Sequence, residues 1–318
     1  MYKMSTIEME QIKKQVQGLL DQGVIRPSTS LCGSPIALVP KKDGTWRMCV
    51  DYHALNKITV KNCYPLPCID DLLDQLKNVV YFTKLDLRSG YHQVQIAKQD
   101  VWKTTFKTKQ GLFEWMVMPF GLCNAPATFM RVMNDLFRPF INEFVLVYLD
   151  DILVFSKSWV EHVCHVMKVL DVLKKEKLYV KLSKCEIEKT SLGYLGHIVG
   201  HDQLKIDPSI VEAIVNWPKP TSVIEVHNFL GAVQYWRIYI ANFSIIAALL
   251  HTLISVKQVF QWGGRQQESF ETLKEKISIA PVLALLDLQQ RFEIKTDSNS
   301  FSMGAIPMQQ KEADFLPF

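Results

Sequence analysis

The sequence contains no long apolar segment and no cysteine pattern typical of a disulfide-rich or zinc-binding protein. No run of about 18 apolar residues occurs, so no membrane-spanning helix is predicted. The first residues, MYKMSTIEMEQIKKQ, are polar and charged and do not resemble a signal peptide. The seven cysteines are odd in number and scattered, without a C-x-x-C pair. That usage argues against a disulfide framework or a zinc ribbon and predicts a reducing compartment.

A strong charge imbalance is also missing. The formal net charge of +4 gives only weak support for a nucleic-acid partner. Two stretches are nevertheless basic, and each is either a solvated surface or a contact for an anionic partner. Their basic residues are Lys41, Lys42, Arg47, Lys57 and Lys61 in the first, and Lys168, Lys174, Lys175, Lys177, Lys181 and Lys184 in the second.

Hydrophobic residues make up 48% and charged residues 21% of the 318 residues, as in a folded globular protein of about two domains. His162, Cys164 and His165 lie close together, but their i, i+2, i+3 spacing is a poor metal-binding pattern. We expect these three residues to belong to an ordinary helix.

Apolar periodicity predicts hairpins and helices without a regular βαβ alternation. A hairpin over 36–52 is indicated by Asp43-Gly44 between two apolar runs. Asn124 is predicted to cap a helix with Pro126 in its first turn, and Ser222 and Glu225 match a capping box that opens a helix through about Ile240. Further helices are predicted at 6–23, 69–78, 159–178 and 269–280, and extended segments at 80–87, 89–96, 179–182, 193–199 and 291–297. A second hairpin is predicted at 102–118, and residues 144–155 are predicted to form two strands joined by a tight turn at Asp150 and Asp151. The predicted fold class is α+β with an antiparallel central sheet.

Two adjacent acids interrupt the apolar segment FVLVYLDDILVF. Asp150 and Asp151 stand at its centre, and Asp86 ends the predicted strand YFTKLD. If the two elements pair, three carboxylates meet at one sheet edge and cannot all stay ionised without cations. Mg²⁺ suits such a group, since it prefers carboxylate oxygens and keeps waters for substrate phosphates. Taken alone, the acid pair also fits an exposed tight turn that binds no metal.

The motifs around these acids resemble one known family. Residues 148–151 match the Y-x-D-D signature of reverse transcriptases. Four further blocks follow the expected order: KKDGTWRMCVDYHALNKITVKNCYPLP, FTKLDLRSGYHQVQI, TTFKTKQGLFEWMVMPFGLCNAPATF and YLGHIV. Together they resemble the reverse transcriptase of gypsy-class (Ty3/gypsy-like) LTR retrotransposons, most of all the plant elements, over nearly the whole chain.

The resemblance implies a right-hand polymerase with fingers, palm and thumb. Such an enzyme extends a primer on an RNA or DNA template with deoxynucleoside triphosphates. Asp86 and Asp150 match the carboxylates that hold two Mg²⁺ ions, with Mn²⁺ as a substitute, and Asp151 completes the site. The primer 3′-hydroxyl would attack the α-phosphate and release pyrophosphate.

Further residues match nucleotide-binding positions of the family. Lys42 and Arg47 match fingers residues that hold the triphosphate. Tyr91 matches the aromatic residue beneath the sugar, where a ring selects deoxynucleotides by clashing with a 2′-hydroxyl. Phe120 and Gly121 match the loop that packs on nucleotide and template.

Lys184 matches a palm lysine that could donate a proton to pyrophosphate. Leu195 and Gly196 match the hairpin that grips the primer backbone, where glycine permits close approach. Asp297 matches the first metal-binding carboxylate of a ribonuclease H domain.

The implied domains are fingers and palm over 1–203, thumb over 204–264, and a linker with a truncated ribonuclease H-like segment over 265–318. Only 22 residues follow Thr296, which leaves no room for the other ribonuclease H carboxylates. We therefore expect no ribonuclease H activity and a fragment of a Pol polyprotein. Pro307, in the next expected strand, also removes a ladder donor.

Several positions depart from the family pattern. His53 and Cys63 stand where arginine is common, Cys123 replaces a small polar residue, and Ile238 replaces the second of two arginines. Lost cations weaken phosphate contacts, so a catalytically inactive remnant that binds nucleic acid is an alternative. Another palm polymerase, such as an RNA-dependent RNA polymerase, is disfavoured by Tyr91 and the motif order. The expected location is the cytoplasm, in the virus-like particle of an intact element, or else the nucleus.

Overall fold

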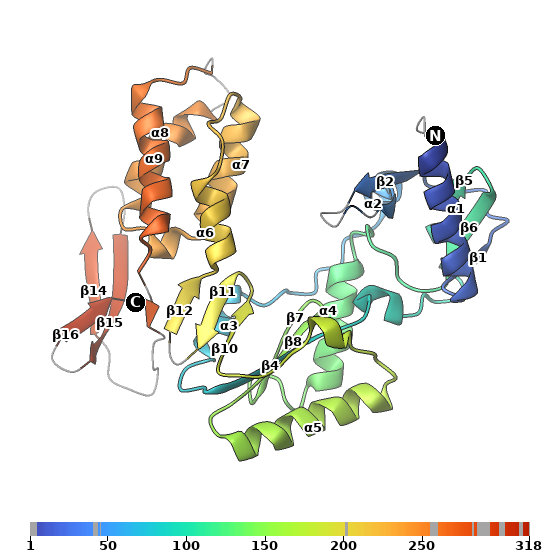
Figure 1. Cartoon of the computed structure of the whole chain (residues 1–318), viewed down its shortest axis with the longest axis horizontal. Coiled ribbons are helices and arrows are strands. Elements are labelled where there is room, and N and C mark those ends of the chain that lie inside the picture. The colour runs from blue at the N-terminus through green and yellow to red at the C-terminus, as the bar shows by residue number, and fades with distance from the viewer. Residues whose placement is uncertain are drawn as a thin grey trace. The chain divides into compact units, whose positions relative to one another are not determined.

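The computed structural model describes residues 5–40, 44, 46–200, 203–254, 260–281, 283–284, 293–298, 303–311 and 314–317. The chain divides into two compact units, which we describe separately (Figure 1). The first contains residues 1–68 and 83–188, and the second contains 69–82 and 189–318. In the described part of the chain, no helix is both long and apolar enough to cross a membrane.

Two small antiparallel sheets form the N-terminal part of the first unit. Strands β2 (Ile36–Pro40) and β3 (Trp46–Val50) make the predicted hairpin, in which Ile36 lies opposite Val50. Strands β1 (Ile25–Pro27), β6 (Gly111–Trp115) and β5 (Phe106–Thr108) form the second sheet in this order. Helix α1 (Thr6–Asp21) buries Ile12 and Val16 in the same apolar cluster as residues of β1, β5 and β6. The helix therefore packs on this sheet.

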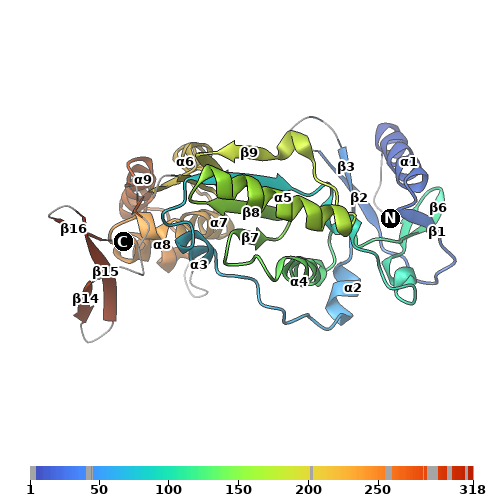
Figure 2. The same cartoon turned by 90° about the horizontal axis from the view of Figure 1, so that it is seen from below.

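The larger part of the first unit is a four-stranded sheet covered by two helices. Its strand order is β7 (Val145–Tyr148), β8 (Asp151–Ser156), β4 (Tyr81–Asp86) and β9 (Glu186–Lys189). Helix α5 (Trp159–Lys175) runs along this sheet in both views (Figures 1 and 2). Helix α4 (Ala125–Phe137) contributes its apolar face to the same core.

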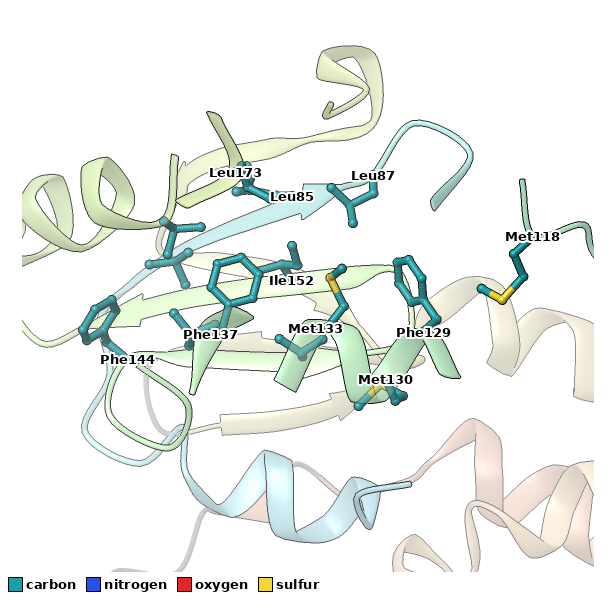
Figure 3. Close-up of a cluster of buried hydrophobic side chains, with 14 of the residues drawn as sticks. Leu85, Leu87, Met118, Phe129, Met130, Met133, Phe137, Phe144, Ile152 and Leu173 are labelled. Carbon is teal, nitrogen blue, oxygen red and sulfur yellow. The ribbon is translucent and has the colours of Figure 1, made fainter. Parts of the chain in front are cut away.

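The core between this sheet and its helices fixes which strand residues face inward. Leu85, Ile152 and Val154 belong to the buried cluster with Phe129 and Phe137 of α4 (Figure 3). Because side chains alternate along a strand, Asp86 and Asp151 lie on the opposite face. The helices therefore occupy one face of the sheet and leave the other for the acids.

Several predicted boundaries of the first unit differ from the structure. Residues 89–96 were predicted to be extended, which is wrong, because Gly90–Gln93 form a 3-10 turn (η1) that begins after Ser89 with a φ of 50°. The predicted strand over 179–182 is wrong too, since Val180 makes only an isolated bridge and Leu182–Lys184 form a 3-10 turn (η3). Asn124 precedes α4, but its side chain does not cap it. It accepts from Asn62 N and donates to Val60 O, which ties a distant loop to the helix.

The second unit combines a short helix, an antiparallel sheet and a helical bundle. Helix α3 (Ile69–Asp74) is shorter than predicted. Strands β10 (Ser191–Tyr194), β11 (His197–Gly200), β12 (Gln203–Ile206) and β13 (Leu283–Ala284) form a sheet in chain order. Helices α6 (Pro208–Val215), α7 (Val223–Gln234), α8 (Phe243–Leu253) and α9 (Gly264–Ser278) make the bundle, where Phe229 and Phe270 pack 4.5 Å apart between ring centroids.

The bundle helices also refine the predictions. Helix α7 ends at Gln234, before the predicted Ile240, and a 3-10 turn (η4, Arg237–Tyr239) follows. Ser222 caps it by accepting from Glu225 N, but the Glu225 carboxylate binds Thr221 N instead of completing a capping box. The last strands, β14 (Glu293–Ser298), β15 (Met303–Lys311) and β16 (Asp314–Pro317), form an antiparallel sheet. Pro307 lies within β15, opposite Ile294, so the strand forms despite the missing donor.

Truncating a core aromatic of α4 should destabilise the first unit strongly. Phe137 is 0% exposed in the core shown in Figure 3. We expect Phe137→Ala to lower the free energy of unfolding by about 3–5 kcal/mol, because it leaves a cavity as well as losing apolar burial. Denaturant titration followed by circular dichroism measures this. Val160→Ala, at a side chain 74% exposed, should change it by about 0.5 kcal/mol or less. Equal effects of the two variants would contradict this description of the core.

Candidate active site

The acid pair sits at the tip of a tight hairpin. Tyr148 of β7 lies opposite Asp151 of β8, so only Leu149 and Asp150 form the turn. Leu149 has a φ of 53°, which a bulky residue rarely adopts and which costs about 1–2 kcal/mol. Its amide donates to Met130 Sδ at 2.9 Å, a contact from helix α4 that holds the turn in place. Strain of this kind is concentrated at functional sites.

Asp86 joins the acid pair from the neighbouring strand. It ends β4, which lies beside β8 in the sheet, and it shares the acid-bearing face with Asp151. Its side chain is 18% exposed and its Oδ2 lies 3.2 Å from Lys184 Nζ. A second ion pair on β4 joins Lys84 Nζ to Glu186 Oε1 at 2.6 Å. Two lysines thus partly neutralise this edge of the sheet.

The carboxylates interact electrostatically. Burial raises the pKa of Asp151 above its usual value, and the nearby charges of Asp150 and Asp86 raise it further. Lys84 and Lys184 oppose that rise. Ionising Asp151 beside Asp86 and Asp150 is therefore unfavourable, and a hard cation would relieve the repulsion.

The donor set fits a divalent cation that is only partly enclosed by protein. Among the described residues, no three His, Cys, Asp or Glu side chains already stand close enough to surround a metal ion. Mg²⁺ commonly takes one or two carboxylates and completes its shell with waters and substrate phosphates. Asp86 and Asp150 could supply those carboxylates, while Asp86 must then share its oxygens between the ion and Lys184.

Gly90 brings another chain segment against the acids. A Cβ at Gly90 would lie 3.1 Å from Phe129 Cζ and 3.2 Å from Asp150 Cβ, so a side chain there would displace one of them. The adjacent Tyr91 ring packs 5.2 Å from the Phe129 ring, between centroids. Burial, and then the charge of Asp150, raise the pKa of the Tyr91 hydroxyl. Tyr91 therefore stands beside the acid pair as a neutral phenol.

Three of the six predicted nucleotide-binding residues border a single cavity. It has a volume of about 560 Å³, and Arg47, Phe120 and Gly121 are among its lining residues. The Arg47 guanidinium carbon lies 6.0 Å from the centroid of the Phe120 ring, and the Tyr91 ring lies 4.9 Å from it. Tyr91 thus links the cavity wall to the acid pair. Lys42 lies outside the described residues.

The structure adds residues that the sequence did not single out. His92 and Trp115 line the same cavity, with ring centroids 4.9 Å apart. Asn56 donates to Gly121 O at 2.8 Å and accepts from Cys123 N at 2.9 Å, which anchors the loop that carries Phe120. Asn56 lies in the family motif that begins KKDGTW, and this position in the motif was the one feature of the sequence that pointed to it.

The predicted primer-contacting hairpin belongs to the second unit. Leu195 and Gly196 form the turn between β10 and β11, with φ values of 50° and 81°. A Cβ at Gly196 would lie 3.0 Å from the Trp236 ring, so glycine is needed for both backbone and space. Leu195 O accepts from Tyr235 OH at 3.1 Å, which ties the turn to the residue that follows α7.

The structure also locates three other positions that the sequence singles out. Asp297 lies in β14 opposite Gly304, and its side chain is outside the described residues. His53, one of the departures from the family pattern, pairs with the neighbouring Asp51. His162 lies in helix α5, as predicted, and is buried.

Neutralising Asp151 should stabilise the metal-free protein. Its raised pKa means that the folded state binds the proton more tightly than the unfolded state, so the ionised group destabilises the fold above that pKa. We expect Asp151→Asn to raise the free energy of unfolding at pH 7 in a chelator by on the order of 1 kcal/mol. The gain should shrink as pH falls through the pKa of Asp151, because the wild-type acid then becomes protonated. Denaturant titrations at several pH values measure it, with the exposed Asp171→Asn as a near-neutral control. A less stable Asp151→Asn at pH 7 would contradict the repulsion.

Comparison with protein families gives two matches. Residues 39–199 match the family described as reverse transcriptase (RNA-dependent DNA polymerase). Residues 262–317 match an RNase H-like domain found in reverse transcriptase. The first match contains Asp86, Asp150 and Asp151.

Curated relatives are polyproteins of retrotransposons. The chain is 39% identical over 311 residues to the retrovirus-related Pol polyprotein from transposon 297 of Drosophila melanogaster, covering 96% of the chain and 29% of the relative. It is 34% identical over 313 residues to the transposon Tf2-3 polyprotein of Schizosaccharomyces pombe, covering 98% of the chain and 24% of the relative. The chain thus spans less than a third of either. The likeness to plant elements stays a prediction.

Solved structures share the fold. The foamy viral protease-reverse transcriptase in complex with double-stranded DNA superimposes with a TM-score of 0.88 at 26% identity, over 99% of this chain and 56% of that one. The foamy viral protease-reverse transcriptase in complex with an RNA/DNA hybrid gives a TM-score of 0.84 at 25% identity. That match covers 99% of this chain and 42% of the viral chain. The predicted α+β fold of right-hand polymerases is therefore confirmed. Enzymes of this kind generally use divalent metal ions. The chain belongs to the reverse transcriptase family, in the branch formed by the Pol polyproteins of gypsy-class retrotransposons.

Proposed function

We propose that this chain is an RNA-directed DNA polymerase that adds deoxynucleotides to a primer 3′-hydroxyl. The observation that carries the proposal is that Asp86 and Asp150 lie near enough to Asp151 to raise its pKa, at neighbouring strand ends within the family match. An RNA or DNA template with its primer is the proposed partner. The complexes of the foamy viral relative with double-stranded DNA and with an RNA/DNA hybrid support it.

Asp86 and Asp150 are the proposed ligands of two Mg²⁺ ions, for which Mn²⁺ could substitute, and Asp151 completes the site. When bound, such ions supply charge neutralisation and a more acidic primer hydroxyl. The 3′-oxygen forms a bond to the α-phosphorus, and the bond from that phosphorus to the pyrophosphate oxygen breaks. Lys184, 3.2 Å from Asp86, is the proposed proton donor to the leaving pyrophosphate.

The cavity beside the acids is the proposed nucleotide site. Arg47 offers a forked guanidinium for the triphosphate, and Lys42 is the proposed second cation. Phe120 and Gly121 would pack on the nucleotide and template. Tyr91 is the proposed steric barrier to a 2′-hydroxyl, and its ring packs against Phe120 and Phe129.

Leu195 and Gly196 would contact the primer backbone, as their tight turn permits close approach. The proposed domains are fingers and palm over 1–203, thumb over 204–264 and a ribonuclease H-like segment from 265, in which Asp297 is the first carboxylate. The proposed location is the cytoplasm, within a particle, with the nucleus as the alternative.

Removing one metal ligand should abolish polymerisation. We expect Asp150→Asn to lower primer extension on poly(rA)/oligo(dT) by about a hundredfold or more with Mg²⁺ or Mn²⁺. Asp135→Asn makes the same charge change at an exposed side chain that pairs only locally with Arg138, and should be nearly neutral. An Asp150→Asn variant as fast as wild type would overturn the site. A wild-type chain that extends no primer with either metal would favour the inactive remnant.

Shortening Tyr91 should weaken sugar selection. Because the ring supplies the steric clash, Tyr91→Ala should raise the use of ribonucleotides relative to deoxynucleotides by about tenfold or more, a difference of about 1.4 kcal/mol. Tyr91→Phe keeps the ring and should preserve the discrimination. Single-nucleotide incorporation with each substrate measures the ratio. A wild type that uses both sugars equally would remove Tyr91 from this role.

A further inference from the structure

A buried polar network joins helix α5 to the strands that carry the acids. His162 on α5 is 1% exposed, and its two ring nitrogens both have partners. Nε2 lies 2.8 Å from Thr83 Oγ1, and Nδ1 lies 3.0 Å from Ser156 Oγ. Ser156 Oγ also lies 2.8 Å from His165 Nδ1. Thr83 Oγ1 accepts from Glu188 N at 3.1 Å.

The network spans three neighbouring strands of one sheet. Thr83 lies in β4, Ser156 in β8 and Glu188 in β9, and the sheet order is β7, β8, β4, β9. Thr83 is three residues before Asp86 on the same strand, and Ser156 is five residues after Asp151. A shift in the register of β4 against β8 would therefore break hydrogen bonds of His162. It would also move Asp86 along the strand direction relative to Asp151.

Apolar packing alone does not forbid such a slide. Apolar burial is non-directional, and a shift of two residues keeps the same side chains facing the core. At about 3.3 Å per residue, that shift would move Asp86 by about 7 Å along the sheet. After such a shift, Asp86 and Asp150 would be too far apart to form a shared metal site. Hydrogen bonds are directional, so bonds from a residue of α5 to β4 can exclude the shifted register.

The network can satisfy all its members when His162 is neutral. Glu188 N–H donates to Thr83 and the Thr83 hydroxyl donates to Nε2, while Nδ1–H donates to Ser156 and the Ser156 hydroxyl donates to His165. Burial, helped by the charge of His165, lowers the pKa of His162, which favours that neutral form. His165 is itself stacked on Phe144, with ring centroids 3.8 Å apart. Because Thr83 and Ser156 are 0% and 4% exposed, breaking one link leaves a buried polar group unpaired.

We infer that His162 is a positioning residue on α5, which through Thr83 sets the register of β4 against β8 and so brings Asp86 level with Asp150 and Asp151. This inference rests on the proposed metal site for its effect on Mn²⁺ binding, and on the proposed polymerase for its kinetic consequence. The proposed role of His162 requires no contact with substrate or metal. Its influence passes through Thr83 to the acid three residues further along β4.

Two substitutions separate the links of His162. The amide of Gln reaches the position of Nε2 and can keep the bond to Thr83, whereas the amide of Asn reaches the position of Nδ1 and can keep the bond to Ser156. We expect His162→Gln to bind Mn²⁺ within about threefold of wild type. His162→Asn, which releases β4, should bind it at least tenfold more weakly. Calorimetric titration of Mn²⁺ into the full chain measures both without requiring polymerase activity. In primer extension, His162→Asn should need a higher Mn²⁺ concentration for half-maximal activity than wild type or His162→Gln.

Controls distinguish positioning from loss of stability. Thr83→Val should behave like His162→Asn, and Thr83→Ser, which keeps the hydroxyl, should restore wild-type Mn²⁺ binding. Thr108→Val removes another buried hydroxyl, one that bonds within the β5–β6 hairpin, and should lower stability without changing the metal affinity. Equal Mn²⁺ affinity of the Gln and Asn variants, or a Thr83→Ser variant as weak as Thr83→Val, would overturn the inference. A wild type that binds Mn²⁺ but extends no primer would count against the polymerase alone.

Discussion

Repulsion between carboxylates held at one face of a sheet is the constraint on which this structure depends. Asp86, Asp150 and Asp151 are brought together by β4 and the β7–β8 hairpin, and burial with mutual repulsion raises the pKa of Asp151. The charges of Lys84 and Lys184 offset only part of this rise in the pKa of Asp151. Under the proposed function, cations bound at Asp86 and Asp150 would relieve that repulsion. The Asp151 charge, which is unfavourable in the free fold, is therefore one that a polymerase of this family would use.

The rest of the first unit resists that repulsion. Helices α4 and α5 bury the opposite face of the sheet, so the acids stand on a rigid support. The strained Leu149 is held by Met130, and Gly90 allows a neighbouring turn to press against Asp150. The buried His162 network adds directional bonds where apolar packing alone leaves the register open. Helices α4 and α5 therefore contribute both apolar packing and specific polar contacts to the support of the acids.

Sequence reasoning reached the features that depend on local pattern. Turn chemistry predicted the β2–β3 hairpin, apolar spacing predicted α4 and α5, and the family motifs predicted which acids to examine. It failed where a distant partner decides the conformation. Asn124 was expected to cap α4, but Val60 and Asn62 compete for its side chain. Residues 90–93 were expected to be extended, but packing against Phe129 and Asp150 favours a compact turn. His162 had the spacing of an ordinary helical residue, and only the fold reveals its partners.

The most direct measurement locates the metal. Crystals of the chain with a template–primer, a non-reactive deoxynucleoside triphosphate and Mn²⁺ would give an anomalous scattering map. We expect two peaks, each about 2.0–2.3 Å from carboxylate oxygens of Asp86 or Asp150 and close to the triphosphate. Strong peaks elsewhere, or a bound triphosphate with no metal at these carboxylates, would contradict the central claim that the acids are gathered to hold catalytic cations.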